Sequence, residues 1–163
     1  MVDAEIIVMC SGHLKFNGIT HIKDELHAAA ARGAKVTVYS NEYMTRDTEP
    51  KATTALAEWG IEHIVVRSGF YLHTKIYYFQ TRDKFSALIG SANITSGGFE
   101  TNEEMSVLIK GIVGDPQHSQ IIAHLEDLDL RCRQAQAVSR KRKGPGRTRH
   151  AKDNATDQSP TKS

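Results

Sequence analysis

The sequence between residues 71 and 105 decides the fold and the function class of this chain. It reads YLHTKIYYF (71–79), IGSANITSGGF (89–99) and TNEEM (101–105). In each of these segments polar residues stand at one end of an apolar run of the kind that forms a buried strand. The stretch therefore predicts neighbouring strands whose ends carry polar side chains, and such positions on a rigid scaffold commonly bear function.

Shorter apolar runs before this stretch alternate with helical patterns. Strands are predicted for three of them, AEIIVM (4–9), KVTVY (35–39) and IEHIVVR (61–67). Between the first two, Thr20 is the expected N-cap of a helix over 21–33 that Gly33 closes. Pro50 is expected to open a second helix over 51–60. This alternation implies a parallel sheet with crossover helices.

The remaining elements change the sheet from parallel to mixed. Three strands with short connections are predicted at 75–80, 85–90 and 104–110, and a long helix at 116–137. Short connections favour antiparallel pairing. The predicted fold class is α/β, with a mixed β-sheet flanked by helices.

Composition and length place the chain among cytoplasmic globular proteins. Its 163 residues are 39% hydrophobic and 25% charged, which is typical of one folded domain. No apolar run is long enough to cross a bilayer, and the charged Asp3 and Glu5 argue against a signal peptide. Cys10 and Cys132 are the only cysteines, which favours a reducing compartment.

The net charge of +2 conceals two parts of opposite sign. Residues 1–138 carry 13 Lys/Arg against 17 Asp/Glu, and residues 139–163 carry 8 Lys/Arg against 2 Asp. The prediction is a folded domain over 1–138 and a basic, disordered tail over 139–163. A run of four basic residues in the tail is expected to bind a polyanion, although a solubilising terminus is the alternative. The run consists of Arg140, Lys141, Arg142 and Lys143.

The candidate catalytic residues are His73 and Lys75, followed by the G-S-x-N segment at 90–93. Residues two apart on a strand share a face, so the imidazole and the ammonium are expected to point into one space. A neutral imidazole can attack phosphorus while a lysine neutralises the phosphate oxygens. Gly90, Ser91 and Asn93 offer a close backbone approach, a hydroxyl and an amide donor for a phosphorane-like transition state.

The combination matters more than either motif alone. His13-Leu14-Lys15 and His21-Ile22-Lys23 also satisfy H-x-K, but neither is followed by a strand, a turn and G-S-x-N. A zinc site made of Cys10, His13, His21 and His27 is a weak alternative, because the chain has no paired C-x-x-C. Tyr71 and Tyr77 are expected on the His73 face, where core packing is a more common role than stacking on bases.

Together these motifs resemble the phospholipase D superfamily, whose pattern is H-x-K followed on neighbouring strands by G-S-x-N. The usual pattern has an Asp five residues after the lysine, where this sequence has Gln80. Nuclease branches similar to metal-independent restriction endonucleases lack that Asp and have a Glu about eleven residues after the Asn. The resemblance assigns this role to Glu104, with Glu103 and Asp83 as alternatives, and implies that the carboxylate holds a ring nitrogen of His73.

The resemblance implies a two-step reaction through a phosphohistidine on His73, with a second histidine as the proton donor. One motif per chain implies one half-site per chain, completed by His73 of a second copy in a two-fold homodimer. No cofactor or metal is expected. The implied activity is a DNA endonuclease of low sequence specificity, and DNA is a more probable partner than RNA. The alternatives are a lipid phosphodiesterase, for which no membrane-binding feature is evident, and a non-catalytic nucleic-acid-binding module.

Overall fold

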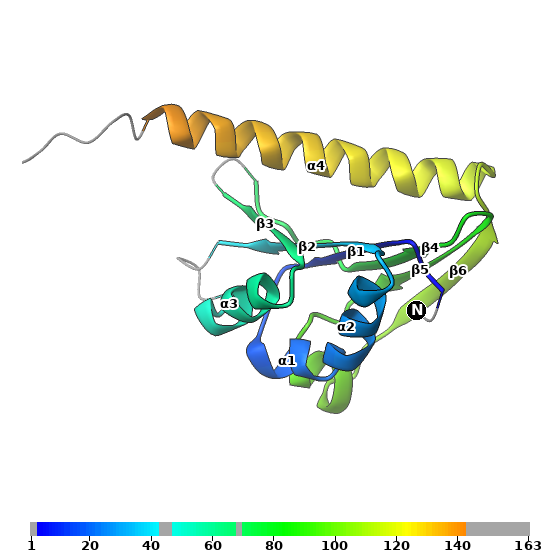
Figure 1. Ribbon diagram of the computed structural model, residues 1–163, viewed down its shortest axis with the longest axis horizontal. Coiled ribbons are helices and arrows are strands. Elements are labelled where there is room, and N and C mark those ends of the chain that lie inside the picture. The colour runs from blue at the N-terminus through cyan, green and yellow to red at the C-terminus, as the bar shows by residue number, and fades with distance from the viewer. Residues whose placement is uncertain (1–2, 43–46, 68–69, 143–163) are drawn as a thin grey trace, which may run out of the picture.

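A six-stranded mixed sheet forms the centre of the molecule (Figure 1). The computed structural model describes residues 3–42, 47–67 and 70–142. The strands are β1 (Ile6–Ser11), β2 (Lys35–Asn41), β3 (Glu62–Val66), β4 (Ile76–Gln80), β5 (Lys84–Gly90) and β6 (Ser106–Ile112). The helices are α1 (Phe16–Thr20), α2 (Lys23–Ala31), α3 (Pro50–Glu58) and α4 (Pro116–Arg142), with a short π-helix, η2 (Gly97–Thr101).

The sheet changes from parallel to antiparallel at β1. The strand order is β3-β2-β1-β4-β5-β6, in which β1, β2 and β3 are parallel to one another. β4 is antiparallel to β1 and β5, and β6 is antiparallel to β5. The predicted α/β class and the mixed sheet are therefore confirmed. β4 begins, and β1, β2 and β5 end, at one rim of the sheet, which we call the site rim.

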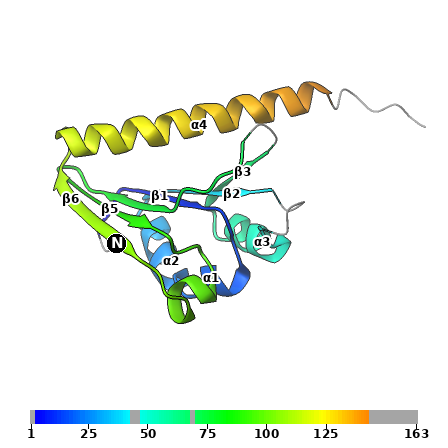
Figure 2. The same ribbon diagram turned by 180° about the vertical axis from the view of Figure 1, so that it is seen from behind.

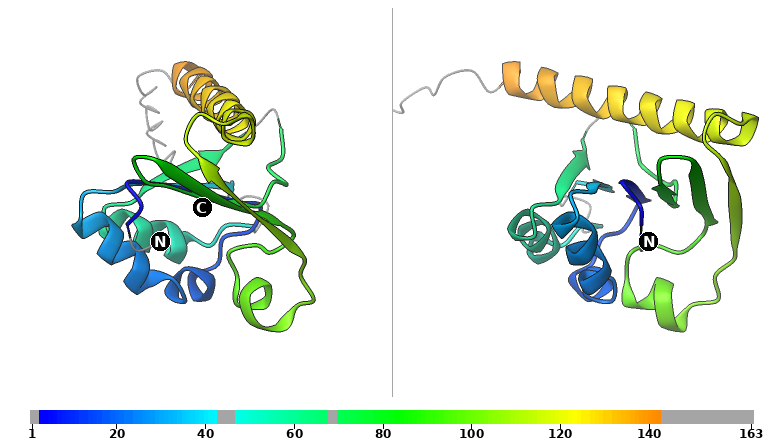
Figure 3. Two further views of the ribbon diagram at one scale, coloured as in Figure 1. Left: turned by 90° about the vertical axis from the view of Figure 1, so that its right-hand side faces the viewer. Right: turned by 45° about the vertical axis from the view of Figure 1, so that its right-hand side comes forward.

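Helices cover both faces of the sheet. α1, α2 and α3 lie on one face and α4 runs across the other, as the views from behind and from the side show (Figures 2 and 3). Ile7 and Met9 are buried in the core cluster that contains Leu26 and Leu56 from the helices. Tyr78 lies in the second cluster, with α4 residues such as Leu128. Adjacent strand residues such as Tyr77 and Tyr78 thus pack in different layers, as strand geometry requires.

Most predicted elements are found within a few residues of their expected bounds, but the first helix differs. The predicted helix over 21–33 is divided into α1 and α2, and Thr20 is the last residue of α1 and not an N-cap. Its hydroxyl donates to the Asn17 carbonyl at 2.7 Å. Gly18 lets α1 approach the backbone beyond β5, since an added Cβ would lie 2.3 Å from the Ile94 carbonyl oxygen. That packing fixes α1 as a separate turn of helix, which a local capping pattern does not reveal.

The last helix extends beyond the predicted domain boundary. α4 continues to Arg142, so the boundary after residue 138 falls inside a helix, and residues 139–142 are helical instead of disordered. Residues 143–163, including Lys143, lie outside the described residues. The predicted disorder of that remaining segment stays a prediction.

His63 on β3 makes stability depend on pH. Its Nε2 lies 2.8 Å from Ser40 Oγ, its buried Nδ1 has no hydrogen-bond partner among the described residues, and burial lowers its pKa to about 4. Between pH 6.5 and 4 the unfolded chain binds a proton at this position and the folded chain does not, so acid favours unfolding. We expect His63 to account for a loss of at most about 3 kcal/mol of stability over this range, at about 1.4 kcal/mol per pKa unit.

Urea titrations at several pH values should show that the free energy of unfolding falls less on acidification in His63→Gln than in the wild type. An equal loss would contradict this role, and His124→Gln on the exposed side of α4 is the matched control.

Candidate active site

His73 and Lys75 lie in the segment that enters β4 at the site rim. Lys75 Nζ donates to the His73 carbonyl at 2.9 Å and lies 3.4 Å from His73 Nδ1. The Lys75 side chain is buried at 7% exposure, whereas His73 is exposed. Burial lowers the pKa of Lys75, and the Glu104 carboxylate partly opposes this. The predicted pairing of imidazole and ammonium is present, although both residues precede the first residue of β4.

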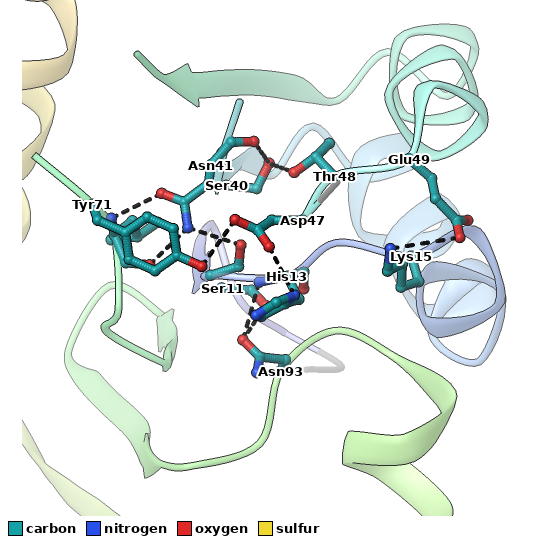
Figure 4. Close-up of polar contacts among 12 residues, drawn as sticks. Ser11, His13, Lys15, Ser40, Asn41, Asp47, Thr48, Glu49, Tyr71 and Asn93 are labelled. Atoms are coloured by element: carbon teal, nitrogen blue, oxygen red, sulfur yellow. Dashed lines mark hydrogen bonds and ion pairs between the residues drawn. The ribbon is translucent and has the colours of Figure 1, made fainter. Parts of the chain in front are cut away.

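Asn93 is held in one orientation by residues at the end of β1 and just beyond it. Its Oδ1 accepts hydrogen bonds from the His13 backbone N–H at 3.1 Å and from Ser11 Oγ at 3.3 Å (Figure 4). With Oδ1 occupied, the amide nitrogen is the group left for a ligand, and it is a donor. Such a fixed donor is suited to an anionic oxygen.

A glycine pair supports Asn93 from behind. Gly98, in η2, packs so closely that an added Cβ would lie 2.3 Å from the Asn93 carbonyl oxygen. At Gly97 the nearest atom to such a Cβ is the side-chain oxygen of Asn102, at 3.1 Å. The glycine pair therefore serves close packing, and Gly98 is the member that fixes the position of Asn93.

Glu104 brings a carboxylate to the same rim through Ser91. The Ser91 hydroxyl donates to Glu104 Oε2, and Asn102 Nδ2 donates to Oε1 at 3.1 Å. The Ser91 and Asn102 hydrogen bonds, with the nearby charge of Lys75, lower the pKa of Glu104. Within the described residues Glu104 makes no hydrogen bond to His73, and its two oxygens accept from Ser91 and Asn102 instead. The contact implied by the resemblance is thus not formed within one chain.

The other carboxylate candidates lie farther from this cluster. Glu103 is exposed. Asp83 lies in the turn between β4 and β5, at the end of β4 opposite the site rim, where its carbonyl accepts from the Val113 N–H at 3.0 Å. Gln80, which stands where the family pattern has Asp, ends β4 at that far side and contacts Tyr78 and His118. Of the three carboxylates that the sequence left open, the structure brings Glu104 to Lys75.

Asn41 was missed by sequence reasoning, and it ties three segments together beneath His73. Its Nδ2 donates to the Gly12 and Leu72 carbonyls, both at 3.0 Å, and its Oδ1 accepts from the Leu72 N–H at 2.8 Å. Asn41 is 2% exposed. A polar residue at the end of an apolar strand was the available signal, and the backbone partners could not be read from the sequence. Asn41 therefore fixes the backbone immediately before His73.

A polar cluster beside Asn93 was also missed. His13, Asp47 and Tyr71 lie together there (Figure 4). The sequence places His13 in an H-x-K pattern that lacks the strand, turn and G-S-x-N context, and in the weak zinc alternative. Over residues 3–42, 47–67 and 70–142 no group of three or more His, Cys, Asp or Glu side chains could hold a metal ion. Cys10, from the weak zinc set, is buried in the layer beneath α4.

The two tyrosines near His73 have different environments. Tyr77 is buried at 7% exposure and donates to the Ala92 carbonyl at 2.8 Å, so it belongs to the core as expected. Tyr71 is 49% exposed, and its ring centroid lies 6.2 Å from that of His73.

The predicted basic run at 140–143 lies away from these residues in the chain. Its residues 140–142 belong to α4, and Lys143 falls outside the described part.

Comparisons with known proteins agree with this fold. The family described as "Cardiolipin synthase, PLD-like domain" matches residues 5–128. Among solved structures, NucT from Helicobacter pylori has a TM-score of 0.57 at 18% identity, covering 77% of this chain and 79% of that one. Polyphosphate kinase from Porphyromonas gingivalis has a TM-score of 0.59 at 20% identity, covering 79% of this chain and only 22% of that one.

The comparison with curated proteins finds no match. In the parts of the chain described here, no helix is sufficiently long and apolar to span a membrane. The family match covers most of the chain, including every residue of the H-x-K and G-S-x-N motifs. The chain therefore belongs to the PLD-like domain family, and it is a phosphodiesterase of the phospholipase D superfamily.

Proposed function

We propose that this protein is a metal-independent DNA endonuclease of low sequence specificity, acting through a phosphohistidine on His73. The observation that carries the proposal is the exposed His73 imidazole beside the buried Lys75 ammonium, 3.4 Å from Nδ1. A buried cation attracts an anion more strongly than an exposed one, because water screens the buried charge poorly. Asn93 adds a fixed donor at the same rim.

The proposed reaction has two steps, and atoms balance in each. A ring nitrogen of His73 bonds to phosphorus as the bond to the leaving oxygen breaks, and a second imidazole gives that oxygen a proton. The same second imidazole then removes a proton from water, whose oxygen displaces His73 from phosphorus. Lys75 and Asn93 stabilise the charge on the phosphate oxygens, which is the service that a metal ion supplies in other phosphodiesterases.

The second imidazole is proposed to be His73 of a second copy. Support comes from β6, which is an edge strand of the sheet and begins two residues after Glu104. Four apolar side chains in β6 or next to it are more than half exposed, namely Met105, Val107, Leu108 and Ile112. Exposed apolar side chains on an edge strand are typical of interaction surfaces, and an open strand edge invites pairing. A two-fold contact here would bring two half-sites together.

We expect Leu108→Glu to convert a dimer into a monomer and to lower DNA cleavage at least about tenfold, because a charge at an apolar interface is costly. Sedimentation velocity and a plasmid-nicking assay measure the two effects. Leu130→Glu is the matched control, since Leu130 on α4 is 56% exposed and Leu108 is 54% exposed. Full activity in a Leu108→Glu monomer would contradict the shared site.

DNA is preferred over other phosphodiesters on two grounds. The segment from 139 onward carries a net charge of +6, and clustered Lys and Arg give sequence-independent attraction to nucleic acid. The fold is also that of NucT, a nuclease of this superfamily.

Plasmid DNA and phosphatidylcholine vesicles, each in excess EDTA, test the proposed substrate. We expect nicking of the plasmid and no release of headgroup from the vesicles. Headgroup release without nicking would transfer the function to lipids. Binding of DNA with neither reaction would favour a non-catalytic binding module, and cleavage that EDTA abolishes would contradict the metal-independent mechanism.

A further inference from the structure

A second imidazole lies at the site rim, outside both family motifs. The His13 backbone N–H donates to Asn93 Oδ1 at 3.1 Å, so His13 directly adjoins a residue of the proposed active site. Its ring Nδ1 lies 3.3 Å from Asp47 Oδ1. The His13 side chain is 42% exposed, whereas that of Asp47 is 10% exposed. His13 is thus a solvent-facing imidazole backed by a largely buried carboxylate.

Asp47 is itself held in place. Its Oδ2 accepts a hydrogen bond from the Tyr71 hydroxyl at 2.9 Å, and its carbonyl accepts from the Leu14 N–H at 2.8 Å. A carboxylate that is fixed in this way fixes the ring that it contacts, as in histidine sites where a carboxylate orients the imidazole. The His13 ring therefore has a defined direction, with Nε2 away from Asp47.

Tyr71 separates His13 from His73. Its hydroxyl contacts Asp47, and its ring lies 6.2 Å, between centroids, from the His73 ring. Across the described segments, no hydrogen bond or ring contact joins the two histidines directly. The two imidazoles therefore face the same rim at separate positions, with Tyr71 and Asp47 between them.

We propose that His13, oriented by Asp47, binds the phosphate next to the one that is cleaved. As an imidazolium, His13 donates from Nδ1 to Asp47 and from Nε2 to a phosphate oxygen. This rests on the proposed function, which assigns Asn93 and His73 to the cleaved phosphate. Each half-site then binds a polymer of phosphodiesters more tightly than a single phosphodiester. Asp47 is a positioning residue, since it acts through His13.

Binding of short DNA tests the proposal without cleavage. In the His73→Ala background, fluorescence anisotropy measures the affinity for a labelled tetranucleotide, and competition measures that for a dinucleotide with one phosphodiester. We expect His13→Gln to weaken tetranucleotide binding about tenfold, equivalent to one lost charge-assisted contact, and dinucleotide binding far less. Asp47→Asn should weaken tetranucleotide binding in the same direction but by a smaller factor.

The control is His124→Gln on the exposed side of α4, and thermal melting checks that each variant is folded. Equal losses for the two oligonucleotides, or no loss for either, would overturn the proposal. Cleavage by protein that retains His73 is measured separately. If that protein does not cleave DNA but His13→Gln still weakens binding selectively, the nuclease function fails and the phosphate site stands.

Discussion

Replacing His73 with alanine is expected to lower the rate of plasmid nicking by at least ~10⁴-fold, because the covalent route loses its nucleophile. The His73 side chain is exposed and, among the described residues, its polar contact is with Lys75, so the substitution removes little packing. The melting temperature should therefore remain close to that of the wild type. Rate and stability, measured on the same preparation, separate a chemical role from a structural one.

His118→Ala is an informative control for His73→Ala. His118 lies on α4 near Gln80, at the far end of β4, and we expect its loss to leave nicking within about twofold of wild type while altering local packing. If His118→Ala abolished nicking and His73→Ala did not, the site would have been assigned to the wrong end of the sheet.

Lys75→Met is expected to lower kcat by about 10²- to 10³-fold, which is the usual cost of losing one group that stabilises transition-state charge. Its effect on folding should be small or favourable, because methionine fills a similar volume and the buried charge is no longer desolvated. Lys75 is 7% exposed, so a stability gain together with a rate loss would be a clear sign of a residue kept for chemistry.

Two further variants sharpen the Lys75 result. Lys75→Arg keeps the charge but enlarges the group in a buried position, and we expect it to recover only part of the rate. Lys84→Met changes an exposed lysine at the opposite end of β5, where no effect above about twofold is expected. Nicking by Lys75→Met at the wild-type rate would show that the buried ammonium does not serve the reaction.

Much of the fold could be predicted because its signals are local. Each of the strands β1 to β6 is predicted by its own apolar run, and the start of α3 is predicted by Pro50. The division between α1 and α2 could not, because it depends on Gly18 packing against the Ile94 backbone, 76 residues away in sequence. The extension of α4 to Arg142 was hidden by the basic composition that suggested disorder.

The site divides in the same way. His73, Lys75 and Asn93 were predictable because a spaced motif carries them, and the structure brings them to one rim. The roles of Asn41 and His13 were not, because their partners are backbone groups and carboxylates contributed by other loops. The direct Glu104–His73 contact implied by resemblance is replaced within the chain by Ser91 and Asn102.

The central claim is the phosphohistidine, and trapping it is the most direct measurement. Wild-type protein would be mixed with DNA in EDTA, quenched in alkali within milliseconds to seconds, digested, and examined by mass spectrometry. We expect a nucleotide adduct on the peptide that contains His73, formed as fast as the DNA is cut and absent from His73→Ala. Cleavage without an adduct, or an adduct on another residue, would contradict the covalent mechanism at His73.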